Sequence, residues 1–351
     1  LKDRDIDDNC RVAIEYQIPM TSKRVDFLIS GIDQNGKENV VVVELKQWEK
    51  AQQTIYEDLV YTYVGGGNRN VTHPSYQAYS YAKTIENFNE SVNEYHINLQ
   101  PCAFLHNYEE EYRGELDNEL YKEAVELAPI FLKNDFSKLT LFIKRFIAKP
   151  DQGEILYKIE YGKIRPSKVL QDSIASMLNG NKEFIMIDEQ KVAFSTIKDL
   201  VNKSLKDNRK HTIIVQGGPG TGKSVIAINL LAEFRNLNVN YVTKNSAPKN
   251  VYFKKLRENN FKLNYVKNLF KGSGAYIDCE PNTFDCLLVD EAHRLNAKSG
   301  IFSNKGENQI KEIINASKVS VFFIDEDQVV TTKDIGSINQ ISYWADECGS
   351  T

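Results

Sequence analysis

One stretch in the middle of the chain, HTIIVQGGPGTGKSVIAINLL at residues 211–231, constrains the fold more than any other. It has the spacing G-x-x-x-x-G-K-[ST] between a β-branched run and an apolar helical run, which predicts a strand, a glycine loop and a helix. In such a loop the backbone N–H groups and the helix N-terminus bind phosphates, the lysine reaches the β- and γ-phosphates, and the hydroxyl binds Mg²⁺. The alternative is a tight turn between a buried strand and a helix. The stretch predicts an ATP·Mg²⁺ site with these nucleotide-binding residues: Gly217, Gly218, Pro219, Gly220, Thr221, Gly222, Lys223 and Ser224.

Two later apolar runs end in polar residues. FDCLLVDEAHRL predicts a strand that ends at Asp290 and Glu291, and VSVFFIDEDQ predicts another that ends close to Gln328. Asp290 and the Ser224 hydroxyl are the expected Mg²⁺ ligands. Glu291 is the expected catalytic residue that orients and deprotonates the attacking water. Strands and helices that alternate, with motifs at strand ends, predict a parallel sheet with its ligand at the carboxyl edge.

The N-terminal part of the chain predicts a separate, antiparallel sheet. RVAIEYQIP, KRVDFLISG and ENVVVVELKQW are three expected strands, and Asn35-Gly36 is the expected hairpin turn between the second and the third. Asp26 lies within the second strand, whereas Glu44 and Lys46, two residues apart on the third, point to one face. Charges at these positions are costly unless they converge on a ligand. The alternative is a solvated strand edge.

The charged residues of these strands suit a hard metal ion. The carboxylates of Asp26 and Glu44, with the carbonyl of Leu45, make an oxygen cage for Mg²⁺ or Mn²⁺. Lys46 can orient a water and offset negative charge in a phosphate transition state. The hypothesis is therefore a phosphodiester-cleaving site in which Asp26, Glu44 and Lys46 are catalytic and the two acids are metal ligands.

With Asp26 as the first acid and ELK, from Glu44, as the E-x-K, this region resembles the PD-(D/E)XK nuclease superfamily. HPSYQAYSYAKTIENF predicts a helix on which Gln77 and Tyr81 share one face, and this Q-x-x-x-Y resembles the extra motif of RecB-like nucleases. Glu15 is the candidate for an additional metal ligand. It lies on the preceding strand, whereas the superfamily often carries such a glutamate on a helix.

The second half of the chain, over residues 165–351, resembles the Schlafen group 3-like DNA/RNA helicase domain of bacterial proteins in GGPGTGKSVIAINLL, YVTKNSAP, VDEAHRL, GENQIKEII and VFFIDEDQ. Asp325-x-x-Gln328 resembles motif III of superfamily 1, although Ile324 replaces the usual glycine, and no Ser-Ala-Thr of superfamily 2 follows DEAH. The resemblance implies ATP and Mg²⁺ as cofactors, a γ-phosphate contact for Gln328, and a nucleic-acid partner, with DNA favoured over RNA. The sequence stops at Thr351, soon after motif III, so a second lobe with its arginine finger is expected to be absent and ATP turnover slow.

Two further sets of residues take expected roles from the helicase resemblance. Gln190 opens the predicted helix EFIMIDEQKVAFSTI and is similar to the glutamine with which helicases read the adenine edge; the alternative is a solvent-facing helix glutamine. A polar turn after the next strand lies where helicases bind the nucleic-acid backbone, and a solvated helix face is the alternative. The candidate phosphate contacts there are Lys244, Asn245, Lys249, Lys254 and Lys255.

The expected fold class is α/β: a PD-(D/E)XK nuclease domain plus a RecA-like parallel-sheet ATPase lobe. The expected domains are the nuclease-like domain at 1–112, a helical connector and linker at 113–165, and the first RecA-like helicase lobe at 166–351. The triple glycine at 65–67 lacks a following lysine and helix, so it is expected to be a flexible loop and not a second phosphate site.

Composition limits the partners and the compartment. A formal net charge of −4 excludes a generally basic nucleic-acid coat, so any such contact comes from local patches. The 5 cysteines are odd in number and form no C-x-x-C pair, which argues for a reducing interior. No apolar run reaches the ~20 residues that span a bilayer. We therefore expect a soluble, cytoplasmic protein without a membrane partner, and the sequence leaves its oligomeric state open.

Together these features predict an ATP-dependent nuclease–helicase, similar to the nuclease–helicase fusions that include phage-defence proteins. Its N-terminal domain would cleave phosphodiesters with a metal, and its P-loop lobe would hydrolyse ATP. One rival hypothesis is a nucleic-acid-triggered ATPase switch that regulates a nuclease or a partner. Another is a nuclease-dead binding module joined to a working ATPase.

Overall fold

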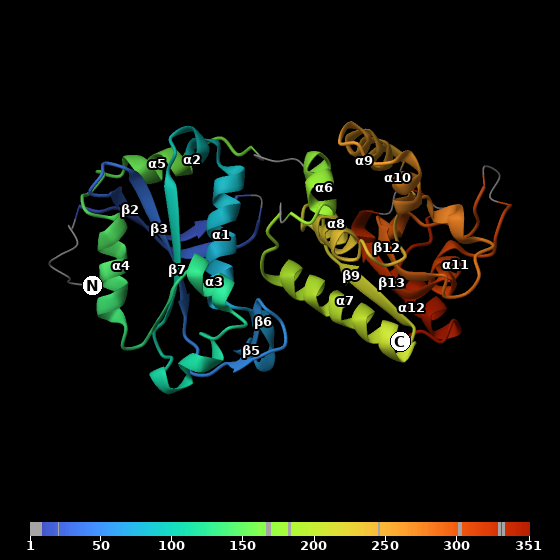
Figure 1. Ribbon diagram of the computed structural model, residues 1–351, viewed down its shortest axis with the longest axis horizontal. Helices are drawn as coiled ribbons and strands as arrows, with labels where there is room; N and C mark the ends of the chain where they lie inside the picture. Colours follow the sequence, from blue (N-terminus) through green and yellow to red (C-terminus); the bar gives the residue numbers. More distant parts are fainter. Residues whose placement is uncertain are drawn as a thin grey trace. The chain divides into compact units, whose positions relative to one another are not determined.

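The chain divides into two compact units (Figure 1). The first unit comprises Leu1–Lys168 and Ile185–Val192, and the second comprises Val169–Phe184 and Ala193–Thr351. The computed structural model describes residues 9–19, 21–165, 170–181, 184–244, 246–300, 304–328, 331 and 334–351.

The first unit is built on a mixed sheet with the strand order β1-β2-β3-β7-β8. The first three strands form the predicted antiparallel meander, and β7 and β8 run parallel to β3. Gly36, in the predicted hairpin turn between β2 and β3, has φ 80°, a left-handed conformation that glycine adopts without strain. The strands of this sheet are β1 (Val12–Gln17), β2 (Arg24–Ile32), β3 (Glu38–Lys46), β7 (Asn98–Leu105) and β8 (Ile130–Leu132).

Helices cover both faces of this sheet, and Figure 1 shows α1 and α4 on opposite sides of the strands. On β3, Val40 and Val42 pack with Tyr81 of α1, whereas Val41 and Val43 pack with residues of α4. The unbroken valine run is therefore buried on both faces, as central strands of α/β sheets are. The helices and 3₁₀ turn of this unit are α1 (Pro74–Phe88), α2 (Glu90–Glu94), η1 (Glu110–Glu115), α3 (Lys122–Leu127), α4 (Phe136–Phe146) and α5 (Glu154–Glu160).

A second, three-stranded sheet lies in the same unit, with the order β4-β5-β6. Its strands are β4 (Gln52–Gln53), β5 (Leu59–Val64) and β6 (Gly67–Thr72). Val64 pairs with Gly67, so the intervening Gly65 and Gly66, at φ 60° and 84°, form a tight hairpin turn. The triple glycine thus closes a hairpin, which differs from the flexible loop expected from the sequence.

The unit boundaries differ from the expected domains in two places. Residues 113–165 belong to the first unit and form no separate connector. Their strand β8 extends the sheet, and the apolar stripe of α4 covers one sheet face, which would otherwise expose valines. Residues 185–192 also belong to the first unit, because Ile187 is buried in the cluster that contains Val40 and Tyr81.

The second unit contains an all-parallel sheet with the order β11-β10-β12-β13-β9, which confirms the predicted parallel sheet. Its strands are β9 (His211–Gln216), β10 (Val239–Thr243), β11 (Phe270–Lys271), β12 (Phe284–Asp290) and β13 (Ser317–Ile324). Its helices are α6 (Leu170–Leu178), α8 (Lys223–Glu233), α9 (Ser246–Glu258), α10 (Leu263–Leu269), α11 (Gln309–Ala316) and α12 (Ile338–Glu347), with η2 (Ser273–Tyr276), η3 (Ala292–Arg294) and η4 (Glu326–Gln328). The α7 helix (Asp188–Asp207) begins in the first unit and continues into the second.

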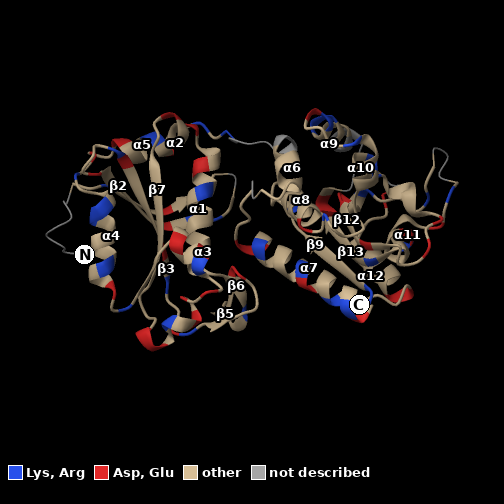
Figure 2. Cartoon of the chain, viewed as in Figure 1, with Lys and Arg blue, Asp and Glu red and all other residues tan. Residues whose placement is uncertain are grey.

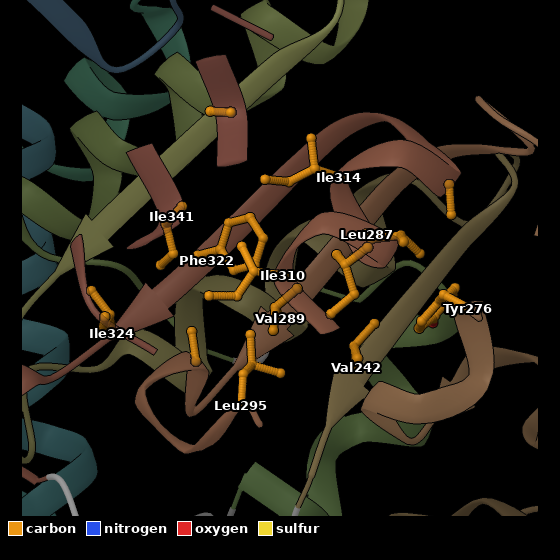
Figure 3. Close-up of a cluster of buried hydrophobic side chains, with 14 residues drawn as sticks. Val242, Tyr276, Leu287, Val289, Leu295, Ile310, Ile314, Phe322, Ile324 and Ile341 are labelled. Atoms are coloured by element: carbon orange, nitrogen blue, oxygen red, sulfur yellow. The ribbon is translucent and has the colours of Figure 1, made fainter. Parts of the chain in front are cut away.

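The core of the second unit lies between its sheet and two C-terminal helices. Figure 3 shows Phe322 and Ile324 of β13 against Ile310 of α11 and Ile341 of α12. The α8 helix packs on β10, β12 and β13 without joining this cluster, so helices cover both sheet faces. Both signs of charge occur along α7 (Figure 2), in keeping with the low net charge. No helix within the described ranges is long and apolar enough to cross a membrane.

Candidate functional sites

The first unit brings the two predicted acids together across β2 and β3. Phe27 lies opposite Val43, so Asp26 and Glu44 occupy the next position along this antiparallel pair. Asp26 Oδ2 accepts a hydrogen bond of 2.7 Å from the backbone N–H of Leu45. The strand pairing thus produces the predicted convergence of carboxylates.

Glu44 is a buried carboxylate with one unused oxygen. Its side chain is 5% exposed, and its Oε1 accepts a hydrogen bond of 2.7 Å from Lys46 Nζ. Its Oε2 is buried and has no hydrogen-bond partner among the described residues. Burial raises the pKa of Glu44 to about 7; Lys46 opposes this rise and the Asp26 carboxylate adds to it. A cation at Oε2 would supply the missing partner.

Helix α1 carries the predicted Gln77 and Tyr81 on the sheet face to which Glu44 points. Gln77 Nε2 donates a hydrogen bond of 2.8 Å to the Tyr81 hydroxyl, so the two side chains share one helix face as predicted. Tyr81 packs with Val40 and Val42, and the alternation along β3 places Glu44 on this face too. Burial raises the pKa of Tyr81, and nearby carboxylates add to the effect, so its hydroxyl stays a donor.

One residue of this site escaped the sequence analysis. The Tyr81 hydroxyl donates a hydrogen bond of 2.5 Å to Asp188 Oδ2, and Lys23 Nζ lies 3.4 Å from the same oxygen. Asp188 is 107 residues from Tyr81 in sequence, and no motif marks it. Only its place directly after the apolar run EFIMI could have suggested that it accompanies a buried segment.

The structure gives Glu15 a partner other than a metal. Glu15 has φ 55°, at the point where the register of β1 and β2 passes from Ile14 to Tyr16 without pairing it. Its side chain is 57% exposed, and its Oε2 lies 3.8 Å from Arg24. Its role as a metal ligand remains a prediction.

Asp26 and Glu44 fit a hydrated divalent ion better than a fully caged one. In the part of the chain that the structure describes, no group of three or more His, Cys, Asp and Glu side chains could hold a metal. Mg²⁺ commonly binds one or two carboxylates and keeps several waters. The unused Oε2 of Glu44 and the adjacent Asp26 suit that mode of binding.

The phosphate loop of the second unit joins β9 to α8 as predicted. Gly220 and Gly222 have φ 72° and 85°, in the left-handed region that favours glycine. A Cβ on Gly217 would lie 2.7 Å from Thr221 Oγ1, so the Thr221 hydroxyl would have to move to accommodate a side chain there. Lys223 Nζ donates to the carbonyls of Gly217 at 2.5 Å and Gly218 at 2.8 Å. These neutral acceptors hold the ammonium at the loop without a direct hydrogen bond to a carboxylate.

The predicted magnesium ligands of the second unit meet at the carboxyl ends of the strands. Ser224 Oγ donates a hydrogen bond of 2.9 Å to Asp290 Oδ2, although β13 separates β9 from β12 in the sheet. Tyr241, in the middle of β10, donates a short hydrogen bond to the same oxygen and was not predicted. Burial and the Asp290 carboxylate raise the pKa of Tyr241, which keeps its hydroxyl a donor. A hydroxyl beside a carboxylate is a ligand pair that suits Mg²⁺.

Glu291 directly follows Asp290 and has a strained backbone conformation. Its φ of 54° lies in the left-handed region, which is costly for a glutamate and common at functional sites. Its Oε2 lies 3.1 Å from His293 Nε2, and its side chain is 36% exposed. Glu291 therefore reaches solvent while its neighbour Asp290 is held inside.

Asp325 and Gln328 follow β13, and Asp325 lies next to the phosphate loop. Asp325 Oδ2 lies 3.8 Å from Lys223 Nζ and has no hydrogen-bond partner within the described ranges. The backbone N–H of Gln328 donates to the Asp325 carbonyl, which closes the 3₁₀ turn η4. An acid next to the loop lysine completes a charged cluster at this sheet edge.

Residues 210–351 match the family model of the Schlafen group 3, DNA/RNA helicase domain. This helicase domain implies ATP and Mg²⁺ as cofactors and nucleic acid as a partner. The matched range begins at residue 210, later than the start near 165 that the sequence suggested, so it includes neither the first unit nor Gln190. No curated protein matches the chain.

Gln190 caps a helix in the structure. Its Oε1 accepts a hydrogen bond of 3.2 Å from the backbone N–H of Ile187, directly before α7. A glutamine in the first turn that reaches back in this way forms half of a capping box. Gln190 belongs to the first unit, and its adenine contact remains a prediction.

The candidate nucleic-acid contacts are only partly described. Lys244 Nζ donates to Asn296 Oδ1 at 2.8 Å and to Asp334 Oδ1 at 3.0 Å, so a phosphate would compete with these partners. Asn245 and the side chain of Lys249 lie outside the described residues.

Proposed function

We propose that this chain is an ATP-dependent nuclease–helicase, in which a metal-dependent nuclease precedes a helicase-type ATPase lobe. The contact of Ser224 with Asp290 carries the ATPase assignment, because it joins the phosphate loop to the end of β12 in a ready magnesium ligand pair. The all-parallel sheet, with β13 between β9 and β12, supports a RecA-like fold. The helicase-domain match over residues 210–351 supports the same assignment.

Each ATPase residue has a distinct chemical part in this proposal. Ser224 and Asp290 would hold Mg²⁺, which neutralises phosphate charge when bound. Lys223 would exchange its loop carbonyls for phosphate oxygens. Glu291, exposed at the strand end, would accept a proton from the attacking water. Gln328 would sense the γ-phosphate.

The unused oxygen of Glu44 carries the nuclease assignment, because a buried, unpartnered carboxylate oxygen next to a second acid suits a metal ion. Asp26 and Glu44 would hold Mg²⁺ or Mn²⁺, which activates the phosphate when bound. Lys46 would offset negative charge on the phosphate and orient a water. The α/β unit with helices on both faces of a mixed sheet supports a PD-(D/E)XK fold.

The biological setting follows from the proposed activities. DNA is the favoured substrate, and phage defence or DNA processing is the proposed role, on the strength of the resemblance to nuclease–helicase fusions. All 5 cysteines are free, which supports a reducing, cytoplasmic compartment.

The test measures ATP hydrolysis and strand cleavage by the purified chain on single-stranded, double-stranded and forked DNA and on RNA. We expect cleavage that needs Mg²⁺ or Mn²⁺ but not ATP, and ATP hydrolysis that nucleic acid stimulates. A chain that cleaves none of these substrates with millimolar Mn²⁺ would contradict the nuclease assignment. A chain that fails to bind ATP would contradict the assignment of a helicase-type ATPase lobe.

One observation favours an ATPase switch with an inactive nuclease-like unit. Lys46 bonds directly to Glu44, so part of the negative charge that would attract a metal is already neutralised. Calorimetric titration with Mn²⁺ separates the two proposals. A switch without nuclease activity predicts no binding that depends on Asp26 and Glu44.

A further inference from the structure

Asp188 contacts the acidic site of the first unit, which comprises Asp26, Glu44, Lys46, Gln77 and Tyr81, although it lies 107 residues beyond Tyr81 in sequence. Its Oδ2 accepts a hydrogen bond of 2.5 Å from the Tyr81 hydroxyl, and its Oδ1 accepts one of 3.3 Å from Thr72 Oγ1. Lys23 Nζ lies 3.4 Å from Oδ2 and offsets its charge. Because the side chain is 10% exposed, these contacts replace most of its water.

The segment that carries Asp188 is anchored on both sides. Ile187 is 7% exposed within the core cluster of Tyr81. Before it, the carbonyl of Met186 accepts a hydrogen bond of 2.8 Å from the Tyr76 hydroxyl. After it, Lys191 Nζ lies 2.5 Å from Asp58 Oδ2. The position of Asp188 is thus set by three contacts of its own segment, at Met186, Ile187 and Lys191, and not by its carboxylate alone.

The anchored carboxylate lies at the end of a hydrogen-bond chain. Gln77 donates to Tyr81 at 2.8 Å, and Tyr81 donates to Asp188 at 2.5 Å. A tyrosine hydroxyl that donates to a fixed acceptor has a fixed lone-pair direction, which in turn orients the Gln77 amide. Asp188 thereby determines how both side chains of the Q-x-x-x-Y pair are presented beside Glu44.

We infer that Asp188 is a positioning residue of the nuclease site, which it reaches through Tyr81. This inference rests on the nuclease activity proposed above. It means that residues 1–165 do not contain the complete site, because a carboxylate from the first turn of α7 completes it. Removal of a residue that orients a catalytic side chain typically lowers activity about 10- to 100-fold.

The test compares metal-dependent DNA cleavage by full-length Asp188→Ala, Tyr81→Phe and the double variant. Alanine is chosen because asparagine would keep an acceptor oxygen for the Tyr81 hydroxyl. We expect kcat to fall about 10- to 100-fold in Asp188→Ala, with KM changed less than about threefold. Because both changes remove the same hydrogen bond, the double variant should be no slower than the slower single variant. Asp199→Ala is the matched control, since this acid of the same helix pairs with Lys203 at 2.7 Å and should cleave normally.

ATP binding accompanies each assay and should match the wild type. Thermal unfolding checks that each variant is folded, since loss of this buried hydrogen bond costs about 1 kcal/mol. If Asp188→Ala does not fold, Tyr81→Phe decides, because it removes only the hydroxyl through which Asp188 acts. Normal cleavage by a folded Asp188→Ala or by Tyr81→Phe would overturn this inference and leave the nuclease assignment standing. Multiplicative losses in the double variant would also overturn it. A wild-type chain without any cleavage would overturn the inference and the nuclease assignment together.

Discussion

The phosphate loop draws its residues from one run, 217–224, whereas the acidic site draws side chains from β2, β3, α1 and the first turn of α7. The lysines of the two sites also differ in their partners. Lys223 bonds neutral carbonyls of its own loop, but Lys46 bonds the carboxylate of Glu44. The Asp325 carboxylate lies 3.8 Å from Lys223 Nζ, farther than the 2.7 Å between Lys46 and Glu44, so the charge of Lys223 is offset less than that of Lys46. The phosphate loop is a local run, whereas the acidic site is assembled from distant segments and its lysine bonds directly to a carboxylate.

The largest expected effect is on ATP hydrolysis, which a substitution at the nucleotide site should separate from DNA cleavage. Glu291→Gln should lower ATP hydrolysis about 10²- to 10⁴-fold, because the amide keeps the shape but cannot accept the proton of the attacking water. ATP binding and metal-dependent DNA cleavage should be unchanged. Equilibrium binding of a fluorescent ATP analogue, phosphate release and cleavage are measured on one preparation. Lys223→Ala is the companion variant, which should lose ATP binding itself. An equal loss of affinity in both variants would show that Glu291 is not the base.

The next effect tests the acidic site without touching the phosphate loop. Lys46→Ala should lower DNA cleavage about 10²- to 10³-fold, the usual contribution of a group that stabilises transition-state charge. Mn²⁺ should still bind, since Asp26 and Glu44 remain, and removal of the cation that neutralises Glu44 should tighten binding. Calorimetric titration and single-turnover cleavage measure the two effects. Lys50→Ala is a nearby control, because this exposed lysine lies over the Tyr112 ring at 5.0 Å and contacts neither acid. Unchanged cleavage in Lys46→Ala would leave only a charged strand edge.

The contrast between local and assembled sites also explains how much could be predicted. The valine run of β3, the turn at Asn35-Gly36 and the phosphate loop are determined by neighbouring residues, so the sequence predicted them. The hairpin around Gly65 and Gly66 was missed because glycines fit flexible loops and tight turns equally well.

The contacts of Asp188 and Tyr241 lie beyond any sequence pattern. Asp188 is 107 residues from its partner Tyr81, and Tyr241 is 49 residues from Asp290. Periodicity predicts which face of an element is buried, but the strand order determines which elements meet at a site. In the second unit, β13 lies between the two motif strands, and no motif encodes that order.

A smaller effect tests whether burial of the ionised Glu44 carboxylate destabilises the first unit. The folded-state pKa of Glu44, about 7, exceeds its ordinary value of 4.5. Folding therefore favours the protonated carboxyl, and the resulting stability is complete below pH 4.5 and lost as the pH rises through 7. The free energy of unfolding of the wild type should therefore fall between pH 5 and pH 8. In Glu44→Gln, which cannot ionise at this position, that fall should be smaller by on the order of 3 kcal/mol at most.

Urea unfolding in EDTA measures this pH dependence through Trp48 of the first unit. A Trp344→Phe background leaves Trp48 as the remaining tryptophan of the 2 in the chain. Glu94→Gln, at an exposed glutamate of α2, is the control and should keep the wild-type pH dependence. The same slope in Glu44→Gln as in the wild type would show that burial of Glu44 does not govern the pH dependence.

The smallest effect concerns Gln190, for which the local sequence pattern and the structure point to different roles. Its Oε1 accepts from the backbone N–H of Ile187, so Gln190→Ala should destabilise the first unit by about 1 kcal/mol, as loss of a helix cap does. Gln190→Glu keeps an acceptor oxygen at the helix N-terminus, where a negative charge is favourable, and should retain that stability. The glutamate lacks the amide N–H groups that would donate to an adenine ring. Competition between ATP and GTP for the phosphate loop therefore decides the adenine contact on a stably capped protein. If Gln190→Glu loses the preference for ATP, base recognition depends on Gln190, and the run 217–224 supplies only the local, phosphate-binding part of the nucleotide site.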